Sequence, residues 1–170
     1  MKTFVQLILL ILWTPFLQLT AQDEVMNYKD LQSYLPTSIN GYEAGEPGGS
    51  TMNMQNMSFS SADIEFTNAN GDNIRITLVD YSAAISMYQA ATAMWNAGMS
   101  FEDDESVAKS VKWDENIMGW EEYRKMDKEA NLSLGIGNRF FLSIQADNQN
   151  NIDFVKSIAK SMALNELSAQ

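Results

Sequence analysis

Apolar and polar side chains alternate in five short runs of this 170-residue chain, and this alternation limits the fold more than any other pattern in it. Successive side chains of a strand point to opposite faces of a sheet, so a half-buried strand alternates in this way. The runs are 58–68, 73–81, 106–113, 131–137 and 139–146. Residues 117–126 are ambiguous between strand and helix, and their position between two strand-like runs favours a strand. The pattern predicts an antiparallel sheet of about six strands.

A turn at Asn70-Gly71 joins the first two runs. Ile64 belongs to the apolar face of the first run, and Ile76 to the apolar face of the second. A two-residue loop would place these apolar positions opposite polar ones, because side chains change face at every residue. The sequence therefore predicts an odd loop of three or five residues that ends at Asp72.

Three segments have apolar residues at helical spacing: 25–35, 83–97 and 152–164. Ser82 is a candidate N-cap of the second, and Gly98 stands where a glycine commonly ends a helix. With the strands, these segments predict an α+β fold, an antiparallel sheet with the helices packed on one face. Residues 22–170 are expected to form a single domain.

Residues 1–21 are typical of a secretory signal peptide. Lys2 supplies the positive charge, residues 4–12 are apolar, and Ala21 is a small residue at a suitable cleavage point. The apolar stretch is shorter than the roughly 20 residues that span a membrane. The chain has no Cys to carry a lipid. We therefore expect a periplasmic or extracellular protein with no stable membrane anchor after cleavage.

Composition excludes several classes of function. The chain has no His and no Cys, so it lacks an imidazole base, a thiol nucleophile and a zinc site of the Cys/His type. Its 22 Asp and Glu against 11 Lys and Arg argue against binding to nucleic acid. We expect a non-catalytic, acidic binding domain without a cofactor, whose partner is an envelope protein or a small ligand. A hydrolase that uses two converging carboxylates remains an alternative.

Met52, Met54 and Met57 form the sharpest local motif, Met-x-Met-x-x-Met. Thioethers are soft ligands that suit Cu(I), and such clusters occur in exported copper-handling proteins. Methionine also adapts its shape at packing and partner surfaces. A periplasmic copper-handling protein is therefore an alternative function.

Trp113, Trp120 and Tyr123 are candidates for an aromatic platform that binds a sugar or a peptide. Aromatic side chains on strands also serve as core or rim packing, and both interpretations stay open.

Four short motifs resemble a group of uncharacterised exported proteins of Gram-negative bacteria. They are Gly45-Glu46-Pro47-Gly48-Gly49-Ser50, Ala62-x-x-x-Phe66, Ile76-Thr77-x-x-Asp80-Tyr81 and Gly137-Asn138-Arg139-Phe140. These are packing and turn motifs, so the resemblance implies kinship of fold and says nothing about chemistry. More distantly, the order of elements is similar to the PsbP-type α/β sandwich, an analogy of fold alone.

Overall fold

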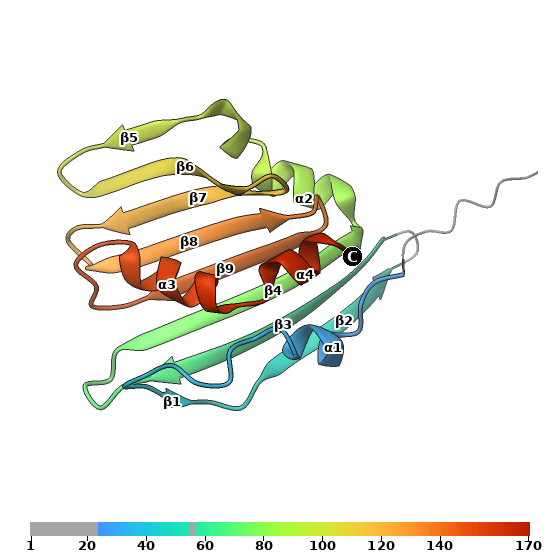
Figure 1. The fold of residues 1–170 in the computed structure, drawn as a ribbon, viewed down its shortest axis with the longest axis horizontal. Coiled ribbons are helices and arrows are strands. Elements are labelled where there is room, and N and C mark those ends of the chain that lie inside the picture. Colours follow the sequence, from blue (N-terminus) through green and yellow to red (C-terminus); the bar gives the residue numbers. More distant parts are fainter. Residues whose placement is uncertain (1–23, 55–56) are drawn as a thin grey trace, which may run out of the picture.

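An antiparallel sheet forms the middle of the molecule in the computed structural model, which describes residues 24–54 and 57–170 (Figure 1). Within these residues the sheet has nine strands. They are β1 (Glu43–Ala44), β2 (Gly48–Met54), β3 (Met57–Thr67), β4 (Asn73–Ala83), β5 (Ser100–Glu102), β6 (Ser106–Asp114), β7 (Ile117–Arg124), β8 (Glu129–Ile136) and β9 (Phe140–Ala146). Their order across the sheet is β1-β3-β4-β9-β8-β7-β6-β5, and β2 pairs with the same edge of β3 as β1.

The loop between β3 and β4 has five residues, which confirms the odd loop predicted from the two apolar faces. Ile64 lies opposite Ile76, and the last pair before the loop is Thr67 with Asn73. The side chain of Asn68 closes this loop, because its Oδ1 accepts hydrogen bonds from the backbone N–H groups of Asn70 and Asp72.

The prediction of about six strands is too low by three. β1 and β2 have no buried residue, so neither shows apolar alternation, and β5 has only three residues. Residues 117–126 contain β7, in agreement with the strand that their position favoured.

The two edges of the sheet differ in charge. β5 is short, and the acidic run 102–105 begins at its last residue. β2 is longer and carries no charged side chain. Charged side chains and short strands protect an edge against pairing with another chain, so the β5 edge is protected and the β2 edge is not.

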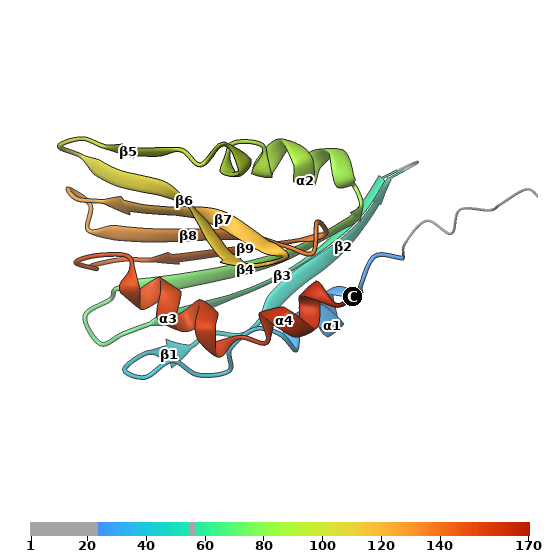
Figure 2. The same cartoon turned by 45° about the horizontal axis from the view of Figure 1, so that its top comes forward.

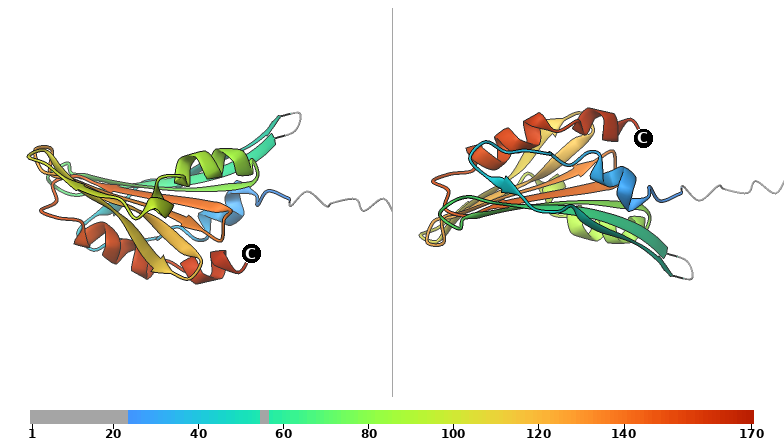
Figure 3. Two further views of the ribbon diagram at one scale, coloured as in Figure 1. Left: turned by 90° about the horizontal axis from the view of Figure 1, so that it is seen from above. Right: turned by 90° about the horizontal axis from the view of Figure 1, so that it is seen from below.

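The helices cover both faces of the sheet, and the expectation of helices on one face is wrong (Figures 2 and 3). One face carries α1 (Tyr28–Gln32), α3 (Asp153–Ser161) and α4 (Leu164–Ser168). The other carries α2 (Ile85–Thr92) and the short 3-10 helix η1 (Trp95–Ala97).

Gly135 of β8 explains the position of α2. A Cβ at this glycine would overlap the Tyr88 hydroxyl and lie 3.1 Å from the Trp95 ring, so both aromatic side chains pack directly on the strand. The Trp95 ring also lies 5.5 Å from the ring of Phe141. α2 begins later than predicted, with Ala84 at the N-cap, because β4 continues through the expected cap.

The hydrophobic core lies between the sheet and the layer of α1, α3 and α4. Its largest fully buried side chains are Leu31, Phe66, Ile74, Ile76, Leu78, Ile117, Leu132, Leu134, Ile136, Phe140, Leu142 and Ile144. Each such side chain stabilises the fold by about 1.5–3 kcal/mol relative to an exposed one. Packing therefore holds this fold together without disulfides, since the sequence has no Cys.

The predicted signal peptide, residues 1–21, lies outside the described residues. In the part of the chain that is described, no helix is both long and apolar enough to cross a membrane.

Candidate functional site

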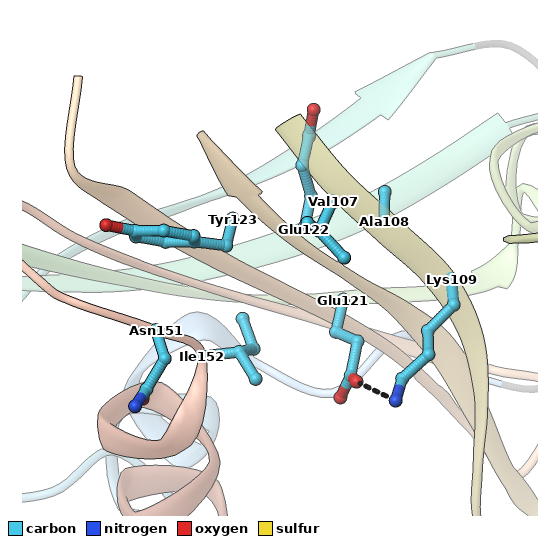
Figure 4. Close-up of a pocket in the computed structure, with 8 residues that line it drawn as sticks. All are labelled: Val107, Ala108, Lys109, Glu121, Glu122, Tyr123, Asn151 and Ile152. Atoms are coloured by element: carbon cyan, nitrogen blue, oxygen red, sulfur yellow. Dashed lines mark ion pairs between the residues drawn. The ribbon is translucent and has the colours of Figure 1, made fainter. Parts of the chain in front are cut away.

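A pocket of about 220 Å³ opens between the strands β6 and β7 and the start of α3 (Figure 4). The residues that line it are Val107, Ala108, Lys109, Glu121, Glu122, Tyr123, Asn151 and Ile152. Alternate residues of the two strands share a face, so Val107, Lys109, Glu121 and Tyr123 all point to the side of α3. The side chains of Val107, Tyr123 and Ile152 make most of the wall apolar.

Glu121 is the buried acidic group of this pocket, with only 5% of its surface exposed. Its Oε1 lies 3.1 Å from Lys109 Nζ, and its Oε2 lies 3.0 Å from Lys156 Nζ. Oε2 is enclosed by protein atoms and is held by this ion pair with Lys156, without a well-directed hydrogen bond. The three side chains come from β6, β7 and α3, so the ion pairs fasten α3 to the edge half of the sheet.

Tyr123 forms a fixed wall of the pocket. Its hydroxyl donates a hydrogen bond of 3.0 Å to the backbone carbonyl of Gln149, and its ring packs against the core. The ring therefore lines the pocket, and its hydroxyl already has a hydrogen-bond partner.

The three candidate platform residues do not come together. Tyr123 and Trp113 point to the α3 side of the sheet, but Tyr123 lies opposite Val107, six residues or roughly 20 Å along β6 from Trp113. Trp120 is an odd number of residues from Tyr123, so it points to the other face. There its ring lies 6.1 Å from that of Phe101.

The three candidate metal-binding methionines do share one face of the β2–β3 hairpin. Met54 lies directly opposite Met57, and Met52 lies opposite Phe59 one step along the same face. Met52 and Met54 are 46% and 51% exposed. The Phe59 ring lies 6.3 Å from that of Tyr81, next to α2, so this is the α2 side of the sheet.

Further exposed apolar side chains belong to α2 and to the segment that follows it. We define the methionine face as six exposed side chains: Met52, Met54, Ile85, Met87, Met94 and Met99. They belong to two segments, 47–62 and 81–101, that contain no Asp, Glu, Lys or Arg. Figure 3 shows the β2–β3 hairpin and α2 rising from the same side of the sheet.

Adjacent acids do not form the pair that a hydrolase needs at this site. Glu121 and Glu122 point to opposite faces of β7. Among the described residues, no group of three or more Asp and Glu side chains is arranged to hold a metal ion.

Comparisons with protein-family models, with curated proteins and with solved structures found no match to the chain. The function is therefore argued from the geometry of the two surfaces described above.

Proposed function

We propose that this protein is an exported, non-catalytic binding module that docks a polypeptide partner through its methionine face. The observation that carries the proposal is the outer surface of α2. Its outward residues include Ile85, Met87 and Ala90, all exposed, and the whole segment from 81 to 101 lacks charge. Ser86 and Gln89 are the polar residues exposed beside them. The solvent face of a helix normally carries charged side chains, so an uncharged face with exposed Ile and Met marks a surface for a partner.

Methionine suits such a docking surface. Its unbranched, polarisable side chain adapts to partners of different shape, and it is common at binding surfaces that must do so. Contiguous exposed apolar patches on a soluble domain mark interaction sites. The six exposed side chains of the methionine face belong to two uncharged segments, and the hairpin and α2 lie on the same side of the sheet, which supports such a site.

The charge of the chain indicates the chemistry of the partner. The net charge is −11, yet the methionine face carries none of it. A partner segment with apolar anchor residues, flanked by Lys or Arg, would bury its anchors here and meet acidic surroundings. Like charge disfavours a second copy of the chain, and acidic surroundings disfavour an anionic membrane.

The proposal includes export, as predicted from residues 1–21, and the absence of catalysis, as predicted from composition. Kinship with the exported bacterial proteins that the motifs resemble is part of it. Two of those motifs contribute Asp80 and Arg139, which form one ion pair. A shared ion pair of this kind would preserve a fold without preserving a chemical activity.

Site-specific photo-crosslinking in the host envelope tests the proposed function. A photoreactive residue replaces Met87 in one variant, Met94 in a second and Met126 in a third. Met126 is the matched control, because it is 80% exposed and belongs to the turn between β7 and β8. We expect the photoreactive residues at positions 87 and 94 to form one discrete adduct with the same partner, and the residue at position 126 to form none. Adding Met94→Glu to the position-87 variant should abolish its adduct. Equal labelling at all three positions, or none, would contradict the proposal.

Copper handling is a second candidate, and the shared face of Met52, Met54 and Met57 favours it. Side chains directly opposite on an antiparallel pair have Cβ atoms about 4.5–5.5 Å apart, so two thioethers there can reach one ion. Thioether ligands prefer Cu(I). The two candidates share residues but differ in ligand, and a metal titration separates them.

A further inference from the structure

We propose that the pocket around Glu121 binds an organic ammonium ion: a small apolar group that carries a protonated amine. This site is separate from the methionine face, which lies on the other side of the sheet. The inference rests on the size of the pocket, its apolar wall and the ion pair between its buried carboxylate and an exposed lysine.

The pocket has room for a small molecule only. Its volume of about 220 Å³ lies below the roughly 300–1,000 Å³ of pockets that hold drug-sized ligands. Its wall consists mainly of the side chains of Val107, Tyr123 and Ile152. An aromatic ring or a short branched alkyl group would therefore fill it.

Glu121 selects the charge of the ligand. Its carboxylate lines the pocket, and Oε1 lies 3.1 Å from the Nζ of Lys109, which also lines the pocket (Figure 4). A ligand ammonium at the position of the Lys109 Nζ would meet Oε1 with opposite charge and donate a hydrogen bond to it.

Lys109 is the group that a ligand ammonium would replace. Its side chain is 57% exposed, so its ion pair with Glu121 is weak and its return to water costs little. Lys156 is only 28% exposed and stays with α3. The exchange of one ammonium for another leaves the local charge unchanged.

Two further features favour a cation. The Tyr123 ring forms one wall, and an aromatic ring attracts an ammonium near its face. The net charge of −11 raises the local concentration of cations around the whole protein. A carboxylate ligand would instead have to compete with Glu121 for the two lysines.

Calorimetric titration of the purified protein with three compounds of one shape tests this inference. Benzylamine is the cation, benzyl alcohol the neutral analogue and benzoate the anion. We expect benzylamine to bind at least about tenfold more tightly than benzyl alcohol, and benzoate not to bind. Tighter binding of benzoate, or equal binding of the amine and the alcohol, would overturn the inference.

Three variants locate the site. Glu121→Gln should weaken benzylamine binding by about tenfold or more, whereas Glu65→Gln, on β3 and outside the pocket, should leave it unchanged. Lys109→Met removes the competing ammonium and should tighten binding about threefold or more. If Glu121→Gln does not fold, Lys109→Met still decides: unchanged or weaker binding of benzylamine would refute the exchange.

Discussion

The guanidinium of Arg139 donates two parallel hydrogen bonds to the carboxylate of Asp80, from Nε to Oδ1 at 3.0 Å and from Nη2 to Oδ2 at 2.8 Å. Asp80 is fully buried, and its Oδ2 also accepts a hydrogen bond of 2.8 Å from the backbone N–H of Met26. Arg139 donates in addition to the backbone carbonyls of Glu24 and Gln170. One ion pair thus joins β4 and the turn before β9 to both ends of the described chain.

Asp80→Asn should lower the free energy of unfolding by about 3–5 kcal/mol, because it removes the negative charge of a buried, hydrogen-bonded ion pair. Urea denaturation measures this change. Glu65→Gln is the control, since Glu65 pairs with Arg75 on an exposed part of the sheet and its loss should cost less than about 1 kcal/mol. Equal effects of the two substitutions would show that the Asp80 pair is not structural.

The same pair should make stability depend on acid. Burial by itself raises the pKa of Asp80, but hydrogen bonds from Arg139, Met26 and Ser82 and the charge of Arg139 outweigh it and lower the pKa below its usual value. A depressed pKa means that the unfolded chain takes up the proton first as the pH falls. The stabilisation is therefore complete above about pH 5 and is lost as the pH drops through the folded pKa.

Urea midpoints measured between pH 7 and pH 2 test this dependence. The wild-type midpoint should fall below about pH 4, and Asp80→Asn should flatten that fall. Part of the fall should remain, because Glu129 also has a lowered pKa. There burial raises the pKa, but hydrogen bonds from Asn131 and Gln145 and the charge of Arg124 outweigh it. If the urea midpoint of Asp80→Asn falls with pH as steeply as that of the wild type, the pH dependence does not come from Asp80.

Gly135→Ala should destabilise the contact between α2 and the sheet, because the added methyl overlaps the Tyr88 hydroxyl. Overpacking of this kind costs about 1–3 kcal/mol. Tyr88→Phe removes the overlapping oxygen, so the double variant should recover part of the loss. Thermal unfolding followed by tryptophan fluorescence measures both, and additive losses in the double variant would refute the contact.

Cu(I) competition against a chromogenic chelator under reducing conditions separates the two candidate functions. If the methionine face serves a polypeptide, neither the wild type nor the Met52/Met54/Met57→Leu variant should withdraw copper from the chelator. Binding of one equivalent by the wild type alone would place copper handling first. Met87→Leu with Met94→Leu is the matched control, since it removes two exposed thioethers away from the hairpin.

The central strands were predictable because one of their faces is buried and the other is partly exposed. Ile64 and Ile76 are buried, whereas the residues before and after each of them are half-buried or exposed. The sequence pattern therefore indicates both the register and the loop length. β2 has no buried face, so its sequence shows no alternation of apolar and polar residues. The face chosen by α2 depends on Gly135, whose lack of a side chain admits Tyr88, and helical spacing alone cannot reveal this contact.

The Glu121 pocket was not predictable for a different reason. Lys109, Glu121 and Lys156 are separated along the chain by spacings that belong to no motif, and only the pairing of β6 with β7 and the packing of α3 unite them. The aromatic candidates failed to converge because Trp120 and Tyr123 differ in strand parity. The three hairpin methionines converge for the same reason of parity, since Met54 and Met57 are partners across β2 and β3.

The unequal edges of the sheet set a limit on assembly. If two copies of the chain pair through their β2 strands, both unprotected edges are used. The edge that stays free in each copy is then β5, which has three residues and lies beside the acidic run 102–105. Two such ends repel each other and offer few backbone groups for pairing. Growth by strand addition therefore terminates after a single step, and a protein with an uncharged edge strand avoids open-ended fibres.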